Sequence, residues 1–346
     1  MSFLVPSGPF GVGSVTRELI DRGRPSHLLS DASGRRLFLK LWYPAERGTG
    51  NEDERLWREV RNDARTPALM RALLQCVRAR TGTRVNGQFV VRAPTSTLIV
   101  YNHGLISFAA ENTSLMQDLA SHGHTVVAIQ HAEQLAEFNA LMRAEPAEKK
   151  KADAELAQRL KAATEAERPR LAVEYYTAST STNRLVVERA ADTSFVLVQI
   201  DDVVAKIPSL RKNAIDTSSA HLVGFSVGGA VSTETAKRDA RAQSVVNLDG
   251  GVQGTLDTKP PSQPYLMLYS SVNDGMNDKL LPQHAQRVAP ADTAHLNYHD
   301  VAGLLPVLRL ARVTGRTNPR AFLEERNRLV REWLLGIERG LVVSIS

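Results

Sequence analysis

The chain has 346 residues, a formal net charge of +6 and 42% hydrophobic residues. That length suits one large domain or two of average size, and the apolar fraction is enough for a sizeable core. The single cysteine, Cys76, excludes an internal disulfide bond and favours a reducing compartment. The basic residues are scattered and accompany no nucleic-acid-binding motif, so we expect a solvated basic surface and no nucleic acid partner.

The sequence carries no signal for export or membrane insertion. Its first residues, "MSFLVPSGPFGVG", contain no basic leader followed by a long apolar stretch. No later run approaches the roughly 18 consecutive apolar residues of a membrane-spanning helix. These patterns predict a cytoplasmic protein without an integral membrane segment.

The first predicted elements lie near the N-terminus, where the segments "RPSHLLS" and "RRLFLKLWYP" flank the turn signal "DASG". This arrangement predicts an antiparallel hairpin at the edge of a sheet. The following residues, 50–80, contain two amphipathic stretches interrupted at Pro67. They predict two helices, because a proline ends a helix at the residue before it.

From residue 95 onward, short apolar runs alternate with segments that are compatible with helix. The runs cover 96–104, 124–131, 218–226, 242–250 and 264–271. They are β-branched or apolar nearly throughout, which is typical of strands buried on both faces. The segments between them cover 109–122, 183–206, 228–240 and 253–263, the last being rich in loop residues. Right-handed crossovers of this kind build a doubly wound, mostly parallel sheet, so we predict an α/β fold.

Two insertions, at about 48–90 and 133–180, interrupt this pattern, and we expect a single domain over 1–346 that carries both. The stretch 133–176 is charged and rich in alanine. It fits either a solvated surface helix or a helical cap over a ligand site. The cap is suggested by its position directly after the carboxyl end of a strand, where ligands bind in open α/β sheets.

The motif Gly224-Phe225-Ser226-Val227-Gly228 follows an apolar strand and precedes a helix-compatible run. In that setting Gly-x-Ser-x-Gly predicts a nucleophile elbow, which is a strained turn that exposes a serine above the sheet. Glycines at both ends of the motif relieve collisions in so tight a turn. The alternative is a helix-capping serine in a glycine-rich turn.

A serine nucleophile needs a base that takes its proton, and a carboxylate that orients this base. In this fold the chain order is serine, acid, histidine. The segment "DTAHLNYHDV" offers His295 and His299 after the last predicted strand, and we expect one of them to be the base. His103 and His131 end earlier strands, and we expect them to line the site without taking the proton.

Two regions offer the acid. The loop after 264–271, where this fold usually carries it, contains Asp274 and, as a weaker candidate, Asp278. Asp249 lies one strand earlier and directly follows an apolar run, and the two glycines after it indicate a buried carboxylate at a sharp turn. Asp274 lies in a polar loop, where an Asx turn at the surface is common. Both loops follow carboxyl ends of neighbouring strands, so either carboxylate can reach the histidine.

The site also needs two backbone N–H groups that face the oxyanion of the tetrahedral intermediate. One belongs to the residue after the nucleophile, Val227, and the other to a loop after an earlier strand. The loop "YNHGLISF" is the candidate, because Gly104 lets its backbone turn toward the serine. We expect Leu105 to be the second donor.

An ordered set of motifs resembles the platelet-activating-factor acetylhydrolase group, in its plasma and type II forms and its bacterial relatives. The motifs are "SGPFGVGSV", "LKLWYP", "NHGLISF", "DLASHGHTVVAIQH", "GFSVGGA", "VVNLDGG", "QPYLMLYS" and "HLNYHD". The resemblance covers most of the chain except 48–90 and 133–180. It departs from the family at Ile106, where the family has the last glycine of "HGLG".

The resemblance implies an α/β-hydrolase fold and a serine hydrolase of carboxylic esters that uses neither a metal nor an organic cofactor. Carried over by position, the nucleophile is Ser226, the acid Asp249 and the base His295. The oxyanion donors are Leu105 and Val227.

The first functional hypothesis is hydrolysis of a small-molecule or lipid-like ester through an acyl-serine intermediate. The second is an acyltransferase, thioesterase or amide-forming enzyme that uses the same triad in a biosynthetic pathway. The third is a non-catalytic scaffold, which a complete Ser, His and Asp set disfavours. Hydrolase and transferase differ in the access of water to the acyl-enzyme, which a sequence does not report, and the sequence leaves the oligomeric state open.

Overall fold

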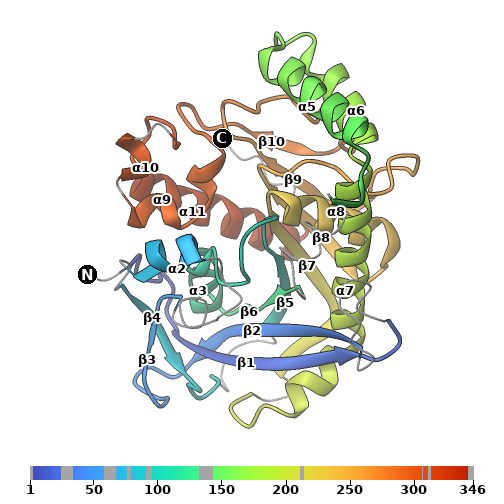
Figure 1. Ribbon diagram of the computed structural model, residues 1–346. Coiled ribbons are helices and arrows are strands. Elements are labelled where there is room, and N and C mark those ends of the chain that lie inside the picture. The colour runs from blue at the N-terminus through green and yellow to red at the C-terminus, as the bar shows by residue number, and fades with distance from the viewer. Residues whose placement is uncertain are drawn as a thin grey trace.

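The computed structural model describes the chain over 3–24, 34–57, 68–75, 79–90, 96–131, 143–210, 214–305, 307–310 and 313–341 (Figure 1). Its strands are β1 (Gly11–Asp21), β2 (Arg35–Ala45), β3 (Asp53–Arg55), β4 (Arg80–Val85), β5 (Ser96–Asn102), β6 (Thr125–Gln130), β7 (Ile215–Phe225), β8 (Ala242–Leu248), β9 (Tyr265–Leu268) and β10 (Gln286–Val288). Its helices are α2 (Ala68–Gln75), α3 (Thr113–Ser121), α5 (Ala147–Ala162), α6 (Arg168–Ala178), α7 (Thr180–Ala205), α8 (Val227–Arg238), the 3-10 helix η2 (His295–Tyr298), α9 (Val301–Leu304), α10 (Val307–Leu310) and α11 (Pro319–Glu338).

Within these ranges the strands form one mixed sheet in the order β10-β9-β8-β7-β5-β6-β2-β1-β4-β3. The neighbours from β10 to β6 are all parallel, and β2 joins them antiparallel to β6. All five apolar runs that were predicted as strands from residue 95 onward are present. The predicted α/β fold with a mostly parallel sheet is therefore confirmed.

The parallel strands are buried on both faces because their alternate side chains enter two separate cores. In β5, Ile99 and Tyr101 belong to the core on the side of α3 and α11. Leu98 and Val100 belong to the other core, which includes apolar residues of α7. Helices thus cover both faces, and the loops at the carboxyl ends of β5, β7, β8 and β9 are left to build a site.

The N-terminal hairpin differs from the prediction. Its second strand is β2, as expected, but the partner that pairs with it antiparallel is β1. The predicted first strand, "RPSHLLS", falls almost entirely on 25–30, which lies outside the described residues. Strand β1 was not predicted because glycines weaken a strand pattern. Gly13 is needed there, since a Cβ at this position would lie 2.4 Å from Cε2 of the Tyr43 ring.

The described residues of the insertion at 48–90 are only partly helical. Helix α2 forms in its second half, but residues 53–55 form strand β3, which pairs antiparallel with β4, so the prediction of a helix there is wrong. Edge pairing and a buried ion pair between Glu54 and Lys40 of β2 override the amphipathic pattern. Pro67 and Cys76 lie outside the described residues.

The described part of the insertion at 133–180 includes helices α5 and α6, which project from the sheet at the top of Figure 1. Helix α5 has no buried side chain, in keeping with its charged sequence. Helix α6 contacts the body of the protein through Tyr176, whose hydroxyl donates to Asn277 Oδ1 at 2.7 Å. Asn277 in turn donates to the carbonyl of Gly250 at 2.8 Å. The insertion is therefore attached to the loop that follows β8.

The crossover helices agree with the predicted segments, as α3, α7 and α8, whereas 253–263 forms a loop. Helix α11 begins where Asn318 caps it, because its side chain accepts from the N–H groups of Arg320 and Ala321. Among the described helices, none combines the length and the apolar composition that crossing a membrane requires. The cytoplasmic location stays a prediction from the sequence.

Candidate active site

Ser226 lies in a sharp turn between β7, which ends at Phe225, and α8, which begins at Val227. Its φ of +56° is in the left-handed region, where a side chain is strained. A Cβ at Gly224 would lie 2.0 Å from the carbonyl oxygen of Gly228, and one at Gly228 would lie 2.0 Å from that of Asn102. Both positions therefore require glycine, because the backbone on either side of Ser226 is in contact with other backbone.

Three side chains from distant parts of the chain meet at this turn. His295 Nε2 lies 3.0 Å from Ser226 Oγ, and His295 Nδ1 lies 2.8 Å from Asp249 Oδ2. Because a carboxylate accepts, Nδ1 carries the hydrogen and Nε2 is free to accept from the serine hydroxyl. The His295 ring stacks on Phe225 with 4.8 Å between the ring centroids. The structure thus brings together Ser226, Asp249 and His295, the three residues that the family resemblance selects.

The carboxylate of Asp249 is buried and surrounded by donors. Besides His295, it accepts from the backbone N–H of Ser270 at 2.6 Å, from the Ser270 hydroxyl at 2.9 Å and from Asn273 Nδ2 at 2.9 Å. Both donor residues follow β9, in the loop that also contains Asp274. They were not among the predicted site residues, although a serine and an asparagine at the carboxyl end of a strand are a usable signal.

The other acid candidates lie elsewhere. The side chain of Asp274 is exposed, and no contact joins it to His295. Asp278 forms an ion pair with Arg287 and accepts from the Tyr269 hydroxyl at 3.1 Å. The loop after β9 therefore holds the Asp249 carboxylate in place and does not bring a carboxylate of its own to the histidine.

His299 is a packing residue whose side chain is 12% exposed. Its Nδ1 accepts the N–H of Val301 at 2.9 Å, and its ring meets those of Trp57, Phe108 and Phe225 edge-on. Burial lowers the pKa of His299 to about 3, so the ring is neutral at physiological pH. Its nearest hydroxyl is that of Ser107, at 3.3 Å from Nε2. The structure therefore does not bring His299 to Ser226.

Leu105 and Val227, the two expected oxyanion donors, come from the loop after β5 and from the N-terminus of α8. Among the described residues, neither backbone N–H has a protein acceptor. The side chains of both residues pack in a small apolar cluster with Val186 and Val231. Ile106, the residue that departs from the family, is 51% exposed beside them.

A buried carboxyl group that was not predicted from the sequence lies behind this loop. Oε1 of Glu111 accepts the N–H of Gly104 at 2.9 Å and the Tyr101 hydroxyl at 2.6 Å. Burial raises the pKa of Glu111 to about 7. Nothing in the sequence around Glu111 separates it from a surface glutamate at the start of a helix.

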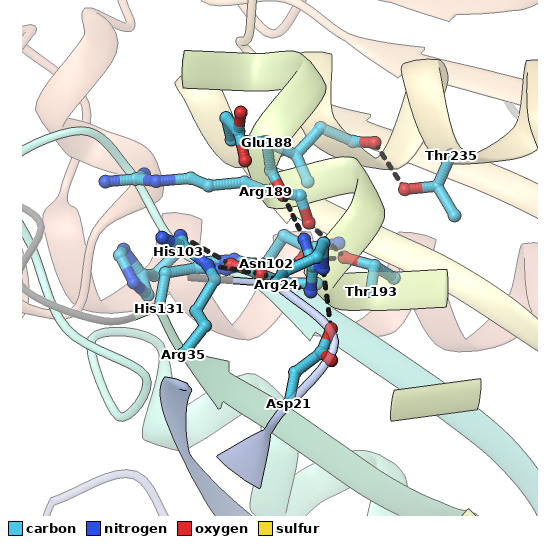
Figure 2. Close-up of polar contacts among 12 residues, drawn as sticks. Asp21, Arg24, Arg35, Asn102, His103, His131, Glu188, Arg189, Thr193 and Thr235 are labelled. Carbon is cyan, nitrogen blue, oxygen red and sulfur yellow. Dashed lines mark hydrogen bonds and ion pairs between the residues drawn. The ribbon is translucent and has the colours of Figure 1, made fainter. Parts of the chain in front are cut away.

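A second group that was not predicted is a buried charged cluster beside α7. Figure 2 shows Arg24, Arg35 and His131 gathered there, and all three contact Asp192, with distances of 2.9, 2.5 and 2.9 Å. Although burial opposes it, the Arg35 guanidinium keeps the pKa of Asp192 below its usual value. Burial lowers the pKa of His131 to about 4. The cluster links α7, which carries Asp192, to Arg35 of β2.

The fold and the sequence are similar to those of known proteins. A ferulic acid esterase from Streptomyces cinnamoneus matches with a TM-score of 0.65 and 19% sequence identity, covering 97% of this chain and 91% of the esterase. At that identity the match shows the α/β-hydrolase fold alone. No curated protein sequence matches the chain.

The family model for platelet-activating factor acetylhydrolase, isoform II, matches residues 3–330. The match includes the serine turn, the loop after β5 and the histidine segment, as well as both insertions. The chain belongs to the family of platelet-activating factor acetylhydrolase, isoform II, and is an ester-hydrolysing enzyme.

Proposed function

We propose that this enzyme cleaves carboxylic esters through an acyl intermediate on Ser226, with His295 as the base and Asp249 as the acid. The observation that carries the proposal is the continuous chain of contacts from Ser226 Oγ to His295 Nε2, at 3.0 Å, and from His295 Nδ1 to Asp249, at 2.8 Å. Such a chain is the arrangement that activates a serine hydroxyl near neutral pH.

In the first step, Ser226 Oγ attacks the ester carbonyl carbon while His295 Nε2 takes the hydroxyl proton. The carbonyl oxygen becomes an oxyanion, and the N–H groups of Leu105 and Val227 are the proposed donors to it. The N-terminus of α8 adds a favourable potential for negative charge. When the tetrahedral intermediate collapses, the bond to the alcohol breaks, and the proton on His295 passes to the leaving oxygen.

In the second step, water attacks the acyl carbon and His295 Nε2 takes its proton. Collapse of this intermediate breaks the bond to Ser226 Oγ, which recovers its hydrogen from His295, and the carboxylic acid leaves. Asp249 stays ionised throughout, because its role is to hold Nδ1–H and to stabilise the imidazolium that forms in each step.

The substrate that we propose is a small-molecule or lipid-like ester with an apolar part next to the carbonyl group. The residues that support this choice are Leu105, which is partly exposed, and Ile106, which is 51% exposed. Val186 and Val231 are fully buried and pack behind Leu105 in an apolar cluster. Apolar surface binds acyl chains more readily than charged groups, because burial of charge without a partner is costly.

The test is covalent labelling of the enzyme with a fluorophosphonate, followed by peptide mapping and by kinetics on p-nitrophenyl esters. We expect one adduct, on Ser226, and a loss of about a millionfold in kcat for Ser226→Ala with no change in melting temperature. Ser218→Ala, which changes an exposed serine, is the matched control and should keep full activity. Wild-type turnover by Ser226→Ala would exclude the acyl-serine mechanism, and ester or amide products formed from added alcohol or amine would identify a transferase.

A further inference from the structure

The peptide between Gly104 and Leu105 is held by a histidine that takes no part in the proposed proton transfer. His103 Nδ1 lies 2.6 Å from the carbonyl oxygen of Gly104. A carbonyl can only accept a hydrogen bond, so Nδ1 must carry the hydrogen and donate it. His103 is therefore fixed in one tautomer by the loop that it contacts.

The protonation state of His103 is equally restricted. The side chain is fully buried, and burial together with the nearby Arg189 guanidinium lowers its pKa well below the usual value. The ring is neutral and has one hydrogen to donate. In the part of the chain that the structure describes, Nε2 has no partner, so the contact with Gly104 is the only hydrogen bond of the ring there.

The geometry of the peptide unit transmits this contact to the active site. In a planar trans peptide the C=O and N–H groups point in opposite directions. A carbonyl of Gly104 that is held toward His103 therefore directs the N–H of Leu105 away from it. The same hydrogen bond polarises the peptide and makes its N–H a stronger donor.

The loop also lies against the nucleophile. A Cβ at Gly104 would lie 3.5 Å from the Cβ of Ser226, and the preceding peptide is fixed by the hydrogen bond from Gly104 N–H to Glu111. Since the peptides on both sides of Gly104 are held, the direction of the Leu105 N–H is set by named side chains and not by the loop alone.

An arginine of helix α7 contacts the same loop. Nη1 of Arg189 lies 3.5 Å from the carbonyl oxygen of Gly104, and Nη2 lies 3.5 Å from that of Leu105. Figure 2 shows the Arg189 side chain extending from α7 past His103. One helical turn later, Asp192 binds Arg35 of β2, which fixes the helix that carries Arg189.

We propose that His103 is a positioning residue for the oxyanion donor: its Nδ1–H holds the Gly104 carbonyl so that the Leu105 N–H points at the developing oxyanion. This inference rests on the proposed acyl-serine function. It adds a role for a buried histidine that is neither the base nor a substrate contact.

The test compares two replacements of equal size. Asn and Leu are nearly isosteric, but Asn carries a donor near the place of Nδ1 and Leu carries none. We expect His103→Leu to lower kcat on a p-nitrophenyl ester by about 10- to 100-fold, which is less than the loss on deleting an oxyanion donor outright, with KM nearly unchanged. His103→Asn should recover most of this loss. A trifluoromethyl ketone, whose adduct with Ser226 carries an oxyanion, should bind His103→Leu more weakly by the same factor.

A matched pair at a second histidine controls for the loss of a buried ring. His221 of β7 is fully buried, and its Nδ1 contacts Oγ of Ser244 on β8 at 2.7 Å. His221→Leu and His221→Asn should lower the melting temperature and leave kcat unchanged. If His103→Leu does not fold, His103→Gln replaces it, because its amide reaches the Nε2 position and offers no donor at Nδ1.

The outcomes separate the two proposals. If the wild-type enzyme forms no acyl or phosphonyl adduct on Ser226, both fail. If it forms one, and folded His103→Leu or His103→Gln keeps the kcat and the ketone affinity of His103→Asn, only the positioning role is wrong. The positioning role would also be overturned if His103→Leu raised KM and lowered the melting temperature while the ratio of the ketone dissociation constant to KM stayed the same.

Discussion

The carboxylate of Asp249 lies 2.8 Å from Nδ1 of His295, and the loop one strand further on donates hydrogen bonds to that carboxylate instead of supplying its own. Asp274, which that loop contains, is exposed. The two loops therefore have separate roles, since the loop after β8 carries the Asp249 carboxylate and the loop after β9 holds it in place. Replacing Asp249 and replacing Asp274 should therefore have different effects on kcat.

Asp249→Asn should lower kcat by about a thousandfold or more, because an amide that donates to His295 favours the wrong tautomer of the imidazole. Asp274→Asn should change kcat by less than about threefold, since its side chain faces solvent. Both values are measured on one activated ester with matched melting temperatures. If Asp274→Asn lost most of its kcat and Asp249→Asn kept a kcat close to that of the wild type, the catalytic acid would be Asp274, in the loop after β9.

Replacement of the two candidate histidines should have opposite effects on activity and stability. His295→Ala should lower kcat by about a millionfold and leave the fold intact, because it removes the base. His299→Phe keeps the aromatic contacts with Trp57 and Phe108 but leaves the N–H of Val301 without an acceptor. We expect it to cost about 1–3 kcal/mol of unfolding free energy and to leave kcat within a few-fold. Urea unfolding and steady-state kinetics on both variants check this, and an inactive but stable His299→Phe would contradict it.

Gly228→Ala should disturb the serine turn, because the new Cβ would lie 2.0 Å from the carbonyl oxygen of Asn102. Overpacking of this kind costs about 1–3 kcal/mol, and a displacement of about 1 Å at the nucleophile can lower kcat about a hundredfold. The control is Gly23→Ala, where the nearest atom would be Asp21 Oδ1 at 3.4 Å. The rates at which a fluorophosphonate labels the two variants test this prediction. We expect Gly228→Ala to be labelled more slowly than Gly23→Ala, and equal rates would refute the prediction.

The protein should lose stability in mild acid. Burial lowers the pKa of His299 to about 3 and that of His131 and His124 to about 4, whereas the unfolded chain takes up these protons near pH 6.5. Below pH 6.5 the unfolded state therefore binds more protons, and each histidine costs up to about 1.4 kcal/mol per pH unit. Glu111 has the opposite sign: its raised pKa of about 7 makes its contribution grow as the pH falls from 7 to 4.5.

Because the pKa of buried His103 is lowered in the same way, four histidines are opposed by one carboxyl group, and we expect the unfolding free energy to fall by about 2–4 kcal/mol per pH unit between pH 6 and 5. Urea titrations at several pH values measure this slope. In His299→Phe the slope should be smaller by about 1.4 kcal/mol per pH unit, because one titrating group is gone. An identical slope in both proteins would show that His299 is protonated in the folded state.

Local sequence patterns predicted those parts of the fold that depend on residues close together in the chain. The apolar runs predicted the strands of the parallel sheet, because a strand buried on both faces needs apolar residues at every position. The strand, the Gly-x-Ser-x-Gly turn and the helix after it lie within a few residues, so the position of Ser226 could be read directly. The start of α11 is equally local, because the Asn318 side chain caps the helix and Pro319 suits its first turn.

The tertiary structure decided which distant side chains meet. Whether Asp249 or Asp274 contacts His295 depends on how the loops after β8 and β9 fold over the sheet, and the hydrogen bonds from Ser270 and Asn273 that settle this cross more than 20 residues of chain. The burial of Glu111 and Asp192 was equally hidden, because a charged residue has no periodic pattern that separates a buried, paired position from a solvated one. Pairing of β1 with β2 and of β3 with β4 depends in the same way on partners far along the chain, since strand pairing gains its free energy from contacts that local sequence does not encode.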